Sequence, residues 1–113
     1  MLERNYNIDF SEENKERFNC ILTEMHDVLL DFGFSIHSNW ITQILSSVIK
    51  EDSLEFQNRV LSFQFLGGAG SICDIQIRDN EKNERFDSLL NSFLKLAYQS
   101  GLRSRDIKSR IAQ

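Results

Sequence analysis

Residues 18–32, FNCILTEMHDVLLDF, decide the fold class of this 113-residue chain. Their apolar side chains recur at steps of three and four residues, as they do along an amphipathic helix. The apolar stripe consists of Phe18, Ile21, Leu22, Met25, Val28, Leu29 and Phe32. Asp9 or Ser11 can cap the start of this helix, and Gly33 can end it in the left-handed conformation. The pattern therefore predicts a helix over about 11–32.

The same spacing recurs in three later segments of the chain. A second helix is expected over roughly 39–50, with Ser38 as its cap and Trp40 at the edge of the core. The indole N–H of a buried tryptophan needs a polar partner. A third helix is expected from Asp52 or Ser53 through Phe65, and a fourth over about 81–100.

Between the third and fourth predicted helices, the run GGAGS at 67–71 favours a turn. Residues 72–77, ICDIQI, then alternate apolar with other side chains, as a half-buried strand does. The best internal partner for such a strand is YNIDF at 6–10, although an extended segment packed on helices fits the pattern equally well. A phosphate loop is disfavoured, because no Lys-Ser or Lys-Thr follows Gly70. A tight corner of the chain is the favoured interpretation.

The sequence as a whole predicts a mainly α fold in a single domain spanning 1–113. We expect a bundle of about four helices, with a Gly-rich loop and a short extended segment before the last long helix. An extended segment (1–10) precedes the bundle and a basic tail (102–113) follows it. The tail is expected to form a short helix, with Ile107 and Ile111 on one side.

Charge and cysteine content narrow the classes of function. The net charge of −4 makes nucleic acid an unexpected partner, because phosphates require a cationic surface. Residues 1–31 carry eight acids and three bases, whereas 102–113 carry four bases and one acid, so these two ends can attract each other within the molecule. Two cysteines outside any C-x-x-C pair, no secretory leader and no long apolar stretch predict a cytoplasmic protein that does not enter a membrane. The two His and two Cys lack ligand spacing, so we expect neither a metal nor a cofactor.

The first predicted helix carries a cluster of acids opposite its apolar stripe, at 100° per residue. This acidic face consists of Glu13, Glu16, Glu24, Asp27 and Asp31. A solvated helix face is the simpler interpretation. The alternative is a docking surface for a basic partner, since complementary charge speeds encounter and sets specificity.

Cys73 and Asp74, together with His26 or His37, suggest a Cys-His-Asp hydrolase. Nucleophilic catalysis requires the thiol to lie against an imidazole, and sequence alone shows no such proximity. In a segment of this pattern, Cys73 is better interpreted as a small apolar residue. We therefore expect no catalytic residues.

At Asn39-Trp40-Ile41, and across 65–75 (FLGGAGSICDI), the chain resembles a family of small, poorly characterised bacterial proteins. The likeness covers roughly 18–100, and its signature is apolar-G-G-x-G-S-apolar-x-D-apolar before a last helix. The signature residues in this chain are Gly67, Gly68, Gly70, Ser71 and Asp74. Cys73 stands where the family often has a polar residue. The resemblance implies a helical protein similar to the immunity-type proteins that accompany bacterial toxins, with no established catalytic residues.

These observations together predict a small cytoplasmic protein that binds another protein. The specific hypothesis is an immunity protein that occludes the active surface of a toxin, with the acidic face opposite a basic toxin domain. A regulatory or scaffold protein that acts through self-association, and hence as a homo-oligomer, is the alternative. A thiol hydrolase is the third hypothesis for the function.

Overall fold

The computed structural model describes residues 5–111, which fold into six α-helices and one 3₁₀ turn. The helices are α1 (Glu12–Asp31), α2 (Ser35–Ile49), α3 (Ser53–Val60), α4 (Phe63–Leu66), α5 (Asn80–Gln99) and α6 (Arg105–Ile111), and the turn η1 (Ile72–Asp74) lies between α4 and α5. No residue in this range belongs to a strand. The predicted mainly α class is therefore confirmed. Residues 1–4 of the predicted extended segment and residues 112–113 of the predicted basic tail lie outside the described residues.

Side-chain caps start three of the helices. The Ser11 side chain accepts a hydrogen bond from the Asn14 amide, and Asp52 and Asp79 cap α3 and α5 in the same way. These oxygens satisfy amides that the first turn of a helix leaves without a partner. The predicted first and fourth helices consequently agree with α1 and α5 to within one residue at each end.

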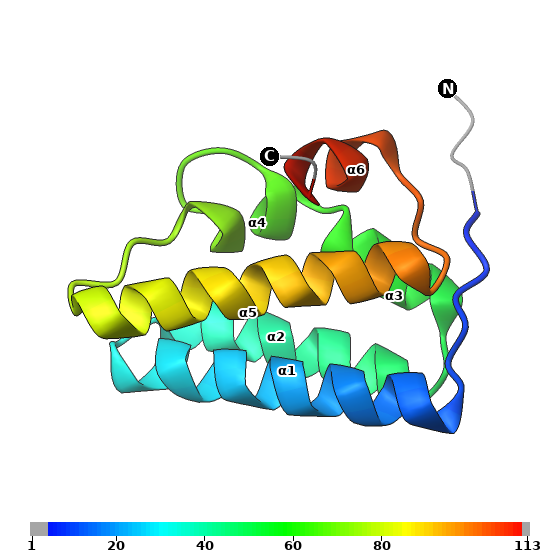
Figure 1. Cartoon of the computed structure of the whole chain (residues 1–113), viewed down its shortest axis with the longest axis horizontal. Coiled ribbons are helices and arrows are strands. Elements are labelled where there is room, and N and C mark those ends of the chain that lie inside the picture. The colour runs from blue at the N-terminus through cyan, green and yellow to red at the C-terminus, as the bar shows by residue number, and fades with distance from the viewer. Residues whose placement is uncertain (1–4, 112–113) are drawn as a thin grey trace.

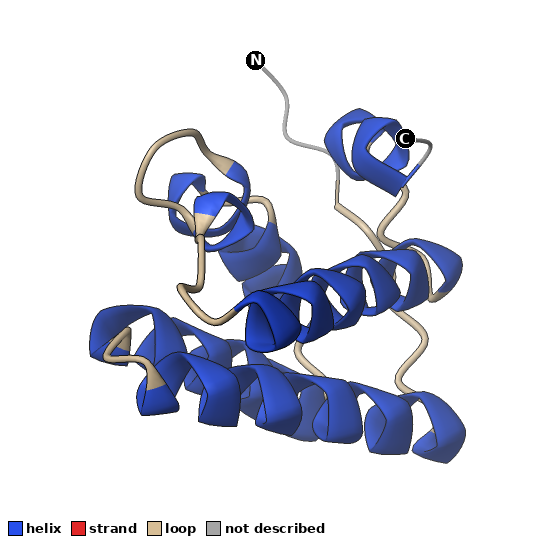
Figure 2. Cartoon of the chain, turned by 60° about the vertical axis from the view of Figure 1, so that its left-hand side comes forward, coloured by secondary structure: helices blue, strands red, loops and turns tan. Residues whose placement is uncertain are grey.

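The helices form layers around α5 (Figure 1). The antiparallel hairpin of α1 and α2 makes one layer, and α5 lies across it. Figure 2 shows α4 and α6 on the other side of α5, while α3 runs back along α2. Five phenylalanines from different elements meet between these layers, with ring centroids 5.3–6.4 Å apart. They are Phe10, Phe18, Phe56, Phe65 and Phe93, and they form the centre of the core.

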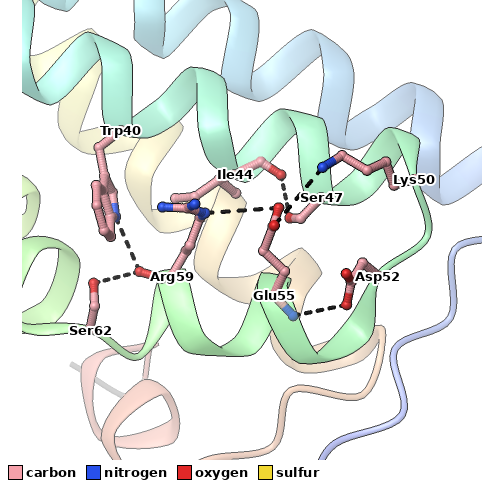
Figure 3. Close-up of polar contacts among 8 residues, drawn as sticks. All are labelled: Trp40, Ile44, Ser47, Lys50, Asp52, Glu55, Arg59 and Ser62. Atoms are coloured by element: carbon pink, nitrogen blue, oxygen red, sulfur yellow. Dashed lines mark hydrogen bonds and ion pairs between the residues drawn. The ribbon is translucent and has the colours of Figure 1, made fainter.

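The predicted third helix is in fact two helices, α3 and α4. In a continuous helix the carbonyl of Arg59 would accept from the amide of Phe63. Instead it accepts from the Ser62 hydroxyl at 2.6 Å and from the Trp40 indole N–H at 3.2 Å (Figure 3). These two donors hold the chain in a bend, so the prediction of one helix through Phe65 was wrong. The expected polar partner of Trp40 is this carbonyl.

The start of the second helix also differs from the prediction. Helix α2 begins at Ser35 rather than near residue 39, and Ser38 lies inside it, with its hydroxyl donating to the Ser35 carbonyl at 2.8 Å. Gly33, at φ 85°, turns the chain so tightly that the next helix starts immediately. Ser38 is therefore buried and does not cap the helix.

The predicted strand at 72–77 is absent, and so is its pairing with 6–10. Amides of Asp74 and Ile75 donate to the carbonyls of Ser71 and Ile72 in the 3₁₀ turn. The alternation of apolar and other residues along 72–77 reflects which side chains pack against the core, because Ile75 and Ile77 are buried while Gln76 is exposed. The backbone amides of the 6–10 segment bond instead to Gln57, Ser53 and the Ser100 carbonyl.

The basic tail forms the expected short helix, α6. Ile107 is fully buried and Ile111 packs against the core. Figures 1 and 2 place α6 on the opposite side of α5 from α1. The acidic α1 and the basic tail thus do not neutralise each other within the molecule.

Candidate functional site

Four of the five predicted acidic-face residues are exposed on α1: Glu13, Glu16, Asp27 and Asp31. The stripe opposite them is buried. Within residues 5–111, Glu13, Glu16 and Asp31 take part in no ion pair or side-chain hydrogen bond. Asp27 lies 3.0 Å from Nδ1 of His26. Glu13, Glu16 and Asp31 therefore have no ion-pair partner among residues 5–111, although Arg17 lines the same shallow hollow as Glu13 and Glu16.

Glu24 differs from the other four, because it is tied to α5. The Arg85 guanidinium donates to both Glu24 carboxylate oxygens, from Nε at 2.5 Å and from Nη2 at 2.6 Å. This bidentate contact lowers the pKa of the Glu24 carboxyl and raises the pKa of Arg85. Glu24 thus links α1 to α5 and already has a countercharge within the molecule.

A groove of about 440 Å³ runs between α1 and α5 beside this ion pair. Three cations line it, Arg17, Arg85 and Lys95, and Glu24 is its only acid. The exposed Cys20 also lies there. The acidic face is therefore bounded on its α5 side by positive charge.

The Gly-rich loop lies between α4 and η1 and contacts the start of α2. The imidazole of His37 lies 2.8 Å from the Gly70 carbonyl oxygen, through Nε2. A side chain at Gly67 would clash with the carbonyl and the ring of Phe63, whereas Gly68 faces open space. Ser71 is buried and Asp74 is exposed. These contacts account for the loop as a corner of the chain.

Cys73 is half-buried, and its environment opposes thiolate formation. Burial raises the pKa of the Cys73 thiol to about 11, while the nearby Arg110 acts more weakly in the opposite direction. His26 and His37 are bonded to Asp27 and Gly70, and within the described residues neither is hydrogen-bonded to a thiol. The Cys-His pair that the hydrolase hypothesis requires is not assembled here.

Cys73 is expected to alkylate slowly at neutral pH, since only the thiolate reacts. A pKa of about 11 leaves a thiolate fraction on the order of 10⁻⁴ at pH 7. We expect iodoacetamide to modify Cys73 about 100-fold more slowly in the folded protein than in urea, as followed by peptide mass spectrometry. The exposed Cys20 serves as the internal control. Equal rates for Cys73 in the two conditions would contradict this account.

A second cluster, which we name the α2–α3 face, was not foreseen from the sequence. It consists of Trp40, Asp52, Leu54, Glu55, Asn58 and Arg59, which line a hollow of about 400 Å³. The Arg59 guanidinium lies over the Trp40 ring, 5.0 Å from its centroid. Since 19 residues separate Trp40 from Arg59, only the α2–α3 packing brings them together. The one signal for this cluster in the sequence was that the indole N–H of a buried Trp40 requires a polar partner.

No group of three or more His, Cys, Asp or Glu side chains is placed to hold a metal ion in the part of the chain described. None of the helices between residues 5 and 111 is both long and apolar enough to span a membrane.

Comparison with known proteins adds no relative: no family model, curated protein or solved structure matches the chain at a significant level. The resemblance to toxin-immunity proteins stays a prediction.

Proposed function

We propose that this protein binds a basic protein partner through the exposed acids of α1, as an immunity protein binds its toxin. The observation that supports this most is the set of exposed carboxylates on one side of α1, most of which form no ion pair among residues 5–111 although Arg17 lies on the same helix. Glu13, Glu16 and Asp31 are the members without any polar partner among the described residues. Cations of a partner would supply the missing countercharges.

The electrostatics of the free protein favour such a partner. Like charges on one helix face repel by a few tenths of a kcal/mol per neighbouring pair, about 0.2–0.5. Binding a cationic surface replaces this repulsion with attraction and raises the rate of encounter. The activity of the toxin would then be blocked sterically. The cations bound by α1 would be those that the toxin needs to bind its own substrate.

The thiol hydrolase hypothesis is less well supported. The Cys73 thiol is shifted away from its reactive form, and both imidazoles have other partners. A surface for recognition, rather than a site for reaction, is the function that the geometry favours.

Growth rescue tests the proposal. The partner to use is the product of the gene beside that of this protein, expressed in bacterial cells at a level that arrests growth. We expect the wild-type protein to restore growth and the double variant Glu16→Lys/Asp31→Lys to restore it poorly, because both changes remove exposed, unpartnered acids.

The matched control is Glu84→Lys/Asp87→Lys, which makes the same change of net charge at exposed positions of α5. It is expected to rescue growth as the wild type does. Equal rescue by the two double variants would refute the role of the acidic face.

A further inference from the structure

The α2–α3 face carries two charged groups, Arg59 and Glu55, that contact each other only at the outer limit of an ion pair. Nε of Arg59 is buried and has no hydrogen-bond partner within residues 5–111. Glu55 Oε2 lies 3.9 Å from this atom, and Glu55 Oε1 lies 4.0 Å from Nζ of Lys50 (Figure 3). Both distances exceed that of a hydrogen bond. The contacts of Glu55 with Arg59 and Lys50 are therefore long ion pairs without hydrogen bonds, and Nε of Arg59 is left without an acceptor.

Exposed apolar surface lies next to these charges. Leu54 is 52% exposed, although leucine is usually buried, and it lines the same hollow as the half-buried Trp40. Trp and Arg are the residue types most enriched among the residues that dominate binding energy at protein interfaces. The α2–α3 face thus has the composition of an interface as well as charges without close partners.

The order of charges along α3 indicates the occupant. Asp52 and Glu55 lie at its N-terminal end, and Arg59 follows Glu55 by four residues, or about 6 Å along the axis. A second α3 placed alongside in the opposite direction would set Arg59 of each copy against the acids of the other. A parallel α3, or a partner of uniform charge, would meet repulsion at one end.

The overall charge of this region agrees with that arrangement. The charged residues of the face itself, Asp52, Glu55 and Arg59, sum to −1, and the neighbouring Lys50 brings the region to zero. Two such regions therefore do not repel each other as two acidic faces of α1 would. We propose that the α2–α3 face is the interface of a two-fold symmetric dimer of this chain, with Arg59 of each protomer bound to Glu55 of its partner. Such an interface is self-complementary, as two-fold symmetry requires. It lies apart from the acidic face and does not rest on the function proposed above.

Charge reversal with mixing tests this dimer. Sedimentation equilibrium of the wild type, between about 1 µM and about 1 mM, is expected to show a mass that rises from one chain to two. Arg59→Glu alone and Glu55→Arg alone place like charges opposite each other, so each is expected to remain a monomer. An equimolar mixture of the two variants restores both ion pairs, and a heterodimer is expected.

Leu54→Glu is the second variant expected to disrupt the dimer. Because Leu54 is exposed, this change places a charge in the proposed interface without altering the fold. It is expected to weaken dimerisation at least tenfold, whereas Glu16→Lys on α1 is expected to leave it unchanged. Circular dichroism confirms that each variant is folded. The proposal is overturned by a wild type that stays monomeric over the whole range. It is also overturned if Leu54→Glu dimerises as the wild type does, or if the mixed variants do not associate.

Discussion

Replacing Phe93 with alanine is expected to lower the free energy of unfolding by about 3–5 kcal/mol. The Phe93 side chain is fully buried, and its ring centroid lies 5.8 Å from Phe18, 6.1 Å from Phe56 and 5.4 Å from Phe65. These rings come from α1, α3 and α4, so one side chain joins all the layers. Because a domain of this size typically has about 5–15 kcal/mol of stability, the variant should be close to unfolding. Urea denaturation followed by circular dichroism measures the loss.

Phe63→Ala is the matched control for that experiment. It deletes the same side chain from a position that is 79% exposed, so the expected loss is about 0.5 kcal/mol or less. Similar losses for the two variants would show that the phenylalanine cluster is not the centre of the core.

Gly101→Ala is expected to destabilise the protein by about 1–3 kcal/mol, for two reasons. Gly101 has φ 129°, which residues with a side chain rarely adopt. A Cβ atom there would also lie 2.5 Å from the carbonyl oxygen of Asn7. The 6–10 segment would have to move away, with loss of the 2.7 Å hydrogen bond from the Asp9 amide to the Ser100 carbonyl.

Gly68→Ala provides the comparison, because Gly68 has open space around it and no positive φ. Its unfolding midpoint in urea is expected to stay the same or to rise slightly. If Gly101→Ala were as stable as Gly68→Ala, the close approach of the N-terminal segment to the end of α5 would be wrong.

Much of the fold could be predicted because its signals are local. The stripes of α1 and α5 and the cap Ser11 belong to contiguous segments, and both helices agree with prediction. The division of α3 from α4 could not be predicted in this way. It depends on the Trp40 indole, from another helix, bonding to the Arg59 carbonyl.

The missing strand has a different cause. Alternation of apolar residues shows that one side of a segment is buried, but a strand also requires a neighbour for its backbone. The 6–10 segment is bonded to Ser53, Gln57 and Ser100, far from 72–77 in the fold. The isoleucines of 72–77 are buried all the same, through a 3₁₀ turn and loop.

The acidic face was predictable only in part. Helical geometry correctly predicted that Glu13, Glu16, Asp27 and Asp31 are exposed. Geometry on one helix carries no information about Arg85, which is 61 residues away in the sequence and engages Glu24. The Arg59–Glu55 arrangement escaped prediction for the same reason, because its environment is made by Trp40 from α2.

Titration calorimetry of the purified protein against the purified product of the neighbouring gene tests the acidic face most directly. We predict a complex whose dissociation constant rises at least tenfold, or by about 1.4 kcal/mol of binding free energy, in the Glu16→Lys/Asp31→Lys variant. The Glu84→Lys/Asp87→Lys control should bind as the wild type does. No detectable heat of binding, or equal dissociation constants for the two double variants, would contradict the account.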